Sequence, residues 1–191
     1  MHSSEVLADW PDESREAAQL VVDKYGEPHE STATQLTWFA VGEWKRVVAT
    51  KAFWEHRFPA PHYDSVESII DYRVAPDLFS ALAQFDGSVV ARRTMGELSA
   101  TCHDEEANRL ALNLAHDLIS GDRDVPDARA YYSKEFTDAR RKAPTPYMQK
   151  LHFTPQSPNP DPDVPTIDEE ELRDAEEEGH PSAGSTSDPP P

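Results

Sequence analysis

The 191-residue sequence has few of the residues from which common cofactor and disulfide sites are built, with one cysteine and seven glycines. A single thiol, Cys102, excludes an internal disulfide and any metal site made of several cysteines. The glycines are scattered, and the sequence contains no Gly-rich phosphate loop, dinucleotide fingerprint or Gly-x-Ser-x-Gly elbow. We expect Cys102 to be a small buried strand residue, with a lone nucleophile followed by His103 as the alternative.

Long apolar stretches are also missing. No segment approaches the roughly 20 apolar residues of a membrane-spanning helix. The first residues, from Met1 to Glu5, lack the basic flank and the apolar run of a secretory signal. We therefore expect a soluble, cytoplasmic protein.

The charge of the chain is strongly one-sided, at −18 overall. Residues 154–191 hold eleven acidic side chains against one base, which leaves −8 on the rest of the sequence. Acidic surfaces repel phosphate backbones and anionic lipid headgroups. Nucleic acid and membranes are therefore not expected as partners, and a protein or a small molecule is the expected ligand.

Composition divides the chain into three parts. Nine of the seventeen prolines lie between residues 155 and 191, where large apolar side chains are almost absent. We predict a flexible lead-in over residues 1–12, a single domain over 13–150 and an acidic, Pro-rich, disordered tail over 151–191. Within that tail, the capping box that begins at Thr166 favours a short acidic helix over residues 167–178.

Apolar periodicity predicts the elements of the domain. In chain order they are a helix over 13–25, a hairpin over 35–40 and 44–54, a strand over 66–74, a short helix over 76–85, a hairpin over 88–94 and 97–102, and helices over 105–120 and 124–139. A helix competes with the strand over 66–74. This order predicts an α+β fold, an antiparallel sheet of about five strands with helices packed on one face.

One polar stripe runs along the otherwise apolar helix 105–120. Arg109, Asn113, His116 and Asp117 fall on one side of it at helical spacing. One interpretation is a ligand-binding cleft in which two or three of these side chains grip one ligand. The other is the ordinary solvent-facing side of an amphipathic helix.

His62 and Asp64 form a second candidate site in an extended loop. Alternate residues of an extended chain point the same way, so both side chains can reach one ligand. With His103 or His116 they would make a hydrolytic metal site. Nothing in the sequence brings these residues together, so we expect no metal and no cofactor.

Four phrases resemble a family of uncharacterised bacterial proteins. They are Lys24-Tyr25-Gly26-Glu27-Pro28, Ile70-Asp71-Tyr72-Arg73-Val74, Phe85-Asp86-Gly87-Ser88 and Asn113-Leu114-Ala115-His116-Asp117. The resemblance spans residues 23–132 and implies one domain there. It implies no activity, substrate or cofactor.

Three functions are compatible with these patterns. The first is a non-enzymatic binding or regulatory domain, suggested by the lack of catalytic motifs. The second is a small hydrolytic enzyme that uses His116 and Asp117 together with His62. The third is an acidic nucleic-acid mimic or interaction protein that acts through its tail.

Overall fold

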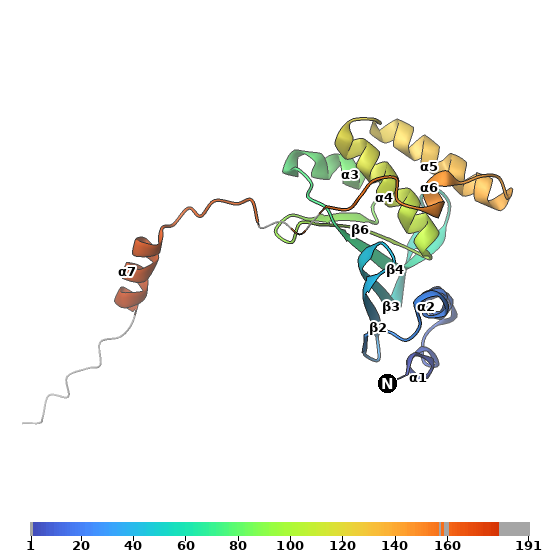
Figure 1. The fold of residues 1–191 in the computed structure, drawn as a ribbon, viewed down its shortest axis with the longest axis horizontal. Helices are drawn as coiled ribbons and strands as arrows, with labels where there is room; N and C mark the ends of the chain where they lie inside the picture. The colour runs from blue at the N-terminus through green and yellow to red at the C-terminus, as the bar shows by residue number, and fades with distance from the viewer. Residues whose placement is uncertain (1, 157, 159–160, 180–191) are drawn as a thin grey trace, which may run out of the picture. The chain divides into compact units, whose positions relative to one another are not determined.

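The computed structural model describes residues 2–156, 158 and 161–179. The chain forms two compact units, residues 1–161 and 162–191. The first unit is an α+β domain built on one sheet, as the sequence predicts (Figure 1). Among the described residues, no helix is both long enough and apolar enough to cross a bilayer.

In the described residues the sheet has six strands, all antiparallel, in the order β1-β2-β3-β4-β6-β5. The strands are β1 Glu30–Ser31, β2 Gln35–Val41, β3 Trp44–His56, β4 His62–Asp71, β5 Val89–Arg92 and β6 Glu97–Cys102. Both predicted hairpins are present. The strand beyond the expected five is β1, whose two residues pair with β2.

The β2–β3 turn depends on a glycine. Gly42 has a φ of +58°, a conformation that L side chains rarely adopt. A Cβ atom there would lie 2.7 Å from the hydroxyl oxygen of Tyr25, at the end of the first long helix. Glycine therefore allows both the turn and its close approach to that helix.

Strand β4 begins four residues earlier than the predicted strand, and the competing helix does not form. His56 pairs with His62 and Trp54 pairs with Asp64, so the end of β3 draws residues 62–64 into the sheet. The register shifts between Ala49 and Trp54, as at a β-bulge, which re-aims the end of a strand. His62 and Asp64 consequently lie on a strand and not in a loop.

Helices cover the face of the sheet that carries the apolar core. The helices are α2 Asp12–Tyr25, α3 Phe79–Phe85, which follows a 3-10 turn over Pro76–Leu78, α4 Glu105–Ser120 and α5 Val125–Arg140. The Asn108 side chain of α4 donates to the Val66 carbonyl at 3.0 Å and to Ser68 Oγ at 2.9 Å, which fixes α4 on β4. Asp104 caps α4 as predicted, with its carboxylate 2.9 Å from the Ala107 amide.

The predicted flexible lead-in is wrong for most of its length. Residues Ser3–Leu7 form helix α1, and Val6, Leu7 and Trp10 are buried in the core. The Trp10 indole N–H donates to the Ala33 carbonyl at 3.0 Å. Burial of these three apolar side chains supplies the free energy that orders the segment.

The domain also continues past residue 150, where the sequence predicts a disordered tail. After α6, Pro146–Gln149, the Gln156 amide donates to the Asp71 carbonyl at 2.9 Å. In the second unit, α7, Glu169–Gly179, begins beside a cap in which the Asp168 carboxylate accepts from the Glu171 amide at 2.8 Å. The predicted acidic helix is therefore present, but it begins two residues later than expected and is capped by Asp168 and not by Thr166. Residues 180–191, also predicted to be disordered, lie outside the described residues.

Candidate functional site

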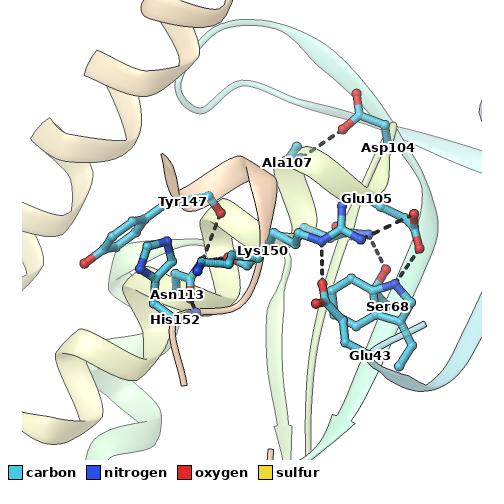
Figure 2. A network of polar contacts seen from close by, with 12 residues as sticks. Glu43, Ser68, Asp104, Glu105, Ala107, Asn113, Tyr147, Lys150 and His152 are labelled. Atoms are coloured by element: carbon cyan, nitrogen blue, oxygen red, sulfur yellow. Dashed lines mark hydrogen bonds and ion pairs between the residues drawn. The ribbon is translucent and has the colours of Figure 1, made fainter. Parts of the chain in front are cut away.

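The polar stripe of α4 is covered by the chain's own C-terminal segment. Asn113 is only 1% exposed, and its amide nitrogen donates to the carbonyls of Tyr147 and Lys150, each at 2.9 Å (Figure 2). Its amide oxygen accepts from the His152 N–H at 2.7 Å. Asn113 therefore holds backbone groups that follow α5 in the chain.

His116 and Asp117 are engaged in the same way. His116 Nδ1 lies 2.7 Å from the Tyr72 hydroxyl, and its ring stacks on Phe153 with centroids 4.3 Å apart. The Asp117 carboxylate accepts from Arg123 at 2.9 Å and from the Tyr147 hydroxyl at 3.0 Å. At Asn113, His116 and Asp117 neither sequence interpretation describes the helix side, because the chain's own C-terminal segment covers it.

Arg109, the fourth predicted ligand-binding residue of α4, belongs to a structural ion-pair network. Its guanidinium pairs with Glu43 and lies 3.7 Å from the buried Glu105 carboxylate. The Tyr25 hydroxyl also donates to Glu105, at 2.7 Å. Burial, followed by this contact, raises the pKa of Tyr25. The network ties α2 and β3 to the start of α4.

His62 and Asp64 do lie together, and they are joined by His56. His62 Nε2 is 3.2 Å from Asp64 Oδ1, and His56 Nδ1 is 3.3 Å from Asp64 Oδ2. One ligand atom from each of the three side chains can be chosen so that all lie within 4.8 Å of one another. In the described chain this is the one group of three histidine, cysteine or acidic residues with metal-site spacing. We call it the His-Asp cluster.

A second set of groups orients these side chains. His62 Nδ1 is 2.8 Å from the Ala60 carbonyl oxygen, and His56 Nε2 is 3.7 Å from Asp86 Oδ1. Ser88 donates from its hydroxyl to Asp64 Oδ2, and its Oγ lies 3.2 Å from His56 Nδ1. Each imidazole thus has one nitrogen toward Asp64 and the other toward an outer oxygen.

The two carboxylates of this region are almost fully buried, at 5% exposure for Asp64 and 3% for Asp86. Burial opposes ionisation of Asp64, but the close contacts with His56 and His62 and the hydrogen bond from Ser88 outweigh it and lower its pKa to about 2. Burial raises the pKa of Asp86. Burial lowers the pKa of His62, but the nearby Asp64 carboxylate and the Ala60 carbonyl outweigh burial and leave the pKa raised.

Two buried atoms of the cluster face each other without a hydrogen bond. They are His62 Nε2 and Asp64 Oδ1. A carbonyl oxygen only accepts, so the contact with Ala60 places the proton of a neutral His62 on Nδ1. The lone pair on Nε2 then points toward a carboxylate oxygen. A positive charge between the two atoms, either a proton or a metal ion, resolves that repulsion.

A cavity of about 230 Å³ lies beside His62. Its lining includes Cys102, His103, Phe136 and Met148. Burial raises the pKa of the Cys102 thiol, so the sulfur is protonated at neutral pH and is a poor nucleophile. The expectation of a buried strand cysteine is confirmed.

The hydrolytic site composed of His62, His116 and Asp117 is not assembled. Ala107 lines the cavity next to His62, and His116 follows nine residues later on the same helix. Nine residues advance an α-helix by about 13 Å. His56 takes the third position instead. The sequence could have placed His56 beside His62 and Asp64 if residues 54–64 had been interpreted as one hairpin around Pro59-Ala60-Pro61.

Comparison with known proteins adds no relative: no family model, no curated protein and no solved structure matches this chain.

Proposed function

We propose that this chain is a non-enzymatic metal-binding domain that holds one divalent transition-metal ion, of the zinc class, on His56, His62 and Asp64. The observation that carries the proposal is the convergence of two imidazole nitrogens and a carboxylate oxygen within 4.8 Å. Imidazole and carboxylate are ligands that zinc and its neighbours accept together. The sequence makes His62 and Asp64 candidates for a metal site but not His56, because His56 joins the other two only through the pairing of β3 with β4.

Charge balance supports a cation at this position. Asp64 and Asp86 are both buried, and an uncompensated buried carboxylate is costly. In the described part of the chain, the side chains that meet these two carboxylates are His56, His62 and Ser88, with no lysine or arginine among them. A divalent ion, or protons on both histidines, would neutralise the pair.

The outer oxygens also favour metal binding. Histidines that ligate metals usually donate their second ring N–H to a backbone carbonyl or a carboxylate. The Ala60 carbonyl lies 2.8 Å from the second ring nitrogen of His62, and the Asp86 carboxylate lies on the corresponding side of His56, at 3.7 Å.

Enclosure favours a structural or regulatory ion over a catalytic one. Catalytic metal sites keep an open coordination position, whereas structural sites are closed. His62 Nε2 and Asp64 Oδ1 are both inaccessible to solvent. The ion would join the β3–β4 hairpin, where the ligands lie, to the loop after α3 that carries Asp86 and Ser88.

Calorimetric titration of the full chain with Zn²⁺, after treatment with a chelator, tests the proposal. We expect one ion per chain for the wild type. Asp64→Asn removes the ligand charge and should weaken binding by more than about 100-fold, while Asp86→Asn, which only supports His56, should weaken it about 10- to 100-fold. The matched control is His103→Gln, which alters a cavity residue outside the cluster and should leave the affinity unchanged.

Circular dichroism melting confirms that each variant folds. A wild type that binds no Zn²⁺ would refute the proposal. So would a folded Asp64→Asn protein with wild-type affinity.

A serine hydrolase is the second candidate, favoured by one further contact. His56 lies between Ser88 Oγ at 3.2 Å and Asp86 Oδ1 at 3.7 Å, which is the order of a Ser-His-Asp triad. For catalysis the Ser88 hydroxyl would turn from Asp64, to which it donates, toward His56. A fluorophosphonate probe separates the two candidates by mass spectrometry. The metal-binding proposal predicts no modification of Ser88, whereas a hydrolase predicts modification that His56→Gln abolishes.

A further inference from the structure

The segment Tyr147–Gln156 crosses α4 and is attached to the domain in the manner of a bound peptide. We call it the C-terminal strap. The side-chain amide of Asn113 makes all three of its hydrogen bonds to strap backbone, at Tyr147, Lys150 and His152 (Figure 2). Such bonds hold a peptide irrespective of its side chains at those positions.

The far end of the strap is held by backbone of the domain. The Gln156 amide donates to the Asp71 carbonyl at 2.9 Å. The Gln156 side-chain oxygen accepts from the Arg73 amide at 2.8 Å. These contacts lie where β4 ends, so the groove runs from Asn113 on α4 to the end of that strand.

Between these anchors the groove accepts one aromatic side chain. Phe153 stacks on His116 at 4.3 Å and packs edge-on against Tyr72 at 5.5 Å. The Tyr72 hydroxyl and His116 Nδ1 are 2.7 Å apart, so the two walls of this aromatic slot are bonded to each other. The slot is therefore built by the domain and not only by the strap.

One strap side chain, Met148, is fully buried. Tyr147, Leu151 and Phe153 are half-buried against the core, and exposed and half-buried residues alternate from Lys150 onward. Segments with few buried apolar contacts open locally at a fraction of the global unfolding free energy.

We propose that this groove is a peptide-binding site which the strap occupies in cis, and that an extended peptide with an aromatic residue, supplied by a partner protein, binds there when the strap opens. Asn113 and the end of β4 hold the backbone of that peptide, and the slot between Tyr72 and His116 takes its aromatic ring. This role is independent of the His-Asp cluster.

Fluorescence anisotropy with a labelled peptide of this chain's residues 145–156 tests the proposal on the full-length protein. The loosened variant carries Phe153→Ala and Gln156→Ala, and the control carries Thr154→Ala, an exposed residue between them. Only protein with an open strap can bind the added peptide, so the apparent Kd for the peptide is the intrinsic Kd divided by the fraction of open protein. We expect the loosened variant to bind the peptide at least about tenfold more tightly than the wild type, and the control to match the wild type. The same peptide with Phe153→Ala should bind at least tenfold more weakly.

Equal peptide affinity for the folded loosened variant and the wild type would overturn the proposal, and so would loss of its cooperative melt. Hydrogen exchange of the wild type gives an independent answer that needs no variant. The His152 and Gln156 amides should exchange much faster than the central amides of β4. If they share the protection of β4, the strap opens only on global unfolding and the proposal fails.

Discussion

Replacing Glu105 with alanine should lower the free energy of unfolding by about 3–5 kcal/mol, because it removes the common partner of several donors at a buried position. Glu105 is 8% exposed. It accepts from Lys24 at 2.5 Å, from the Tyr25 hydroxyl at 2.7 Å and from the Trp44 indole N–H. Without the carboxylate, the tyrosine and tryptophan donors are left unsatisfied, which is the costly outcome for polar groups removed from water.

Chemical denaturation at neutral pH measures this effect. Glu105→Gln keeps the size and one acceptor oxygen, so it should recover part of the loss but not the charge facing Lys24 and Arg109. Glu106→Gln is the matched control, since the adjacent side chain is exposed and its replacement should change stability by less than about 0.5 kcal/mol. A Glu105→Ala protein as stable as this control would show that the network contributes nothing.

Replacing Glu97 with glutamine should lower the free energy of unfolding by about 2–3 kcal/mol at neutral pH. Glu97 lies on β6 and is 1% exposed. One carboxylate oxygen is 2.9 Å from the Lys45 amine, and the other is 3.3 Å from the Arg46 guanidinium. Glutamine preserves the shape and removes the charge from both ion pairs.

The loss should depend on pH in a defined direction. Burial raises the pKa of Glu97, but Lys45 and Arg46 outweigh it, and the folded-state pKa is below the usual value. A lowered folded-state pKa stabilises the protein above the unfolded pKa of about 4.3, and this contribution disappears as the pH falls through the folded value. The wild type and Glu97→Gln should therefore differ most at neutral pH and converge in acid. Urea titrations between pH 3 and 7 measure that difference, and a constant offset would contradict the prediction.

The fold followed from patterns that act over a few residues. The apolar stripe and the Asp104 cap placed α4 at residues 105–120, and alternation placed both hairpins. Periodicity and capping depend on neighbouring residues of one element, so they can be recognised without knowing which element packs against it. The prediction of a flexible lead-in was wrong because Val6, Leu7 and Trp10 are too few to form a recognisable periodic pattern, yet together they fill part of the core.

The same distinction between local spacing and tertiary contacts applies to the candidate sites. The two-residue period of extended chain was enough to point His62 and Asp64 the same way. It could not supply His56, which arrives through the register of β3 on β4 beyond an irregularity after Ala49. The polar stripe of α4 could be recognised in the sequence, but the segment that covers it could not, because the strap begins more than 25 residues after the end of α4.

By itself the sequence determined the helices α2, α3, α4 and α5, both hairpins, the polar side of α4 and the shared direction of His62 and Asp64. Each depends on the spacing of side chains along a single element. Tertiary structure alone decided that His56 completes a cluster with these two residues, and that Asn113 and His116 hold the chain's own backbone and Phe153. Such contacts join residues far apart in the chain, and their geometry exists only once the sheet register and the packing of α4 are set.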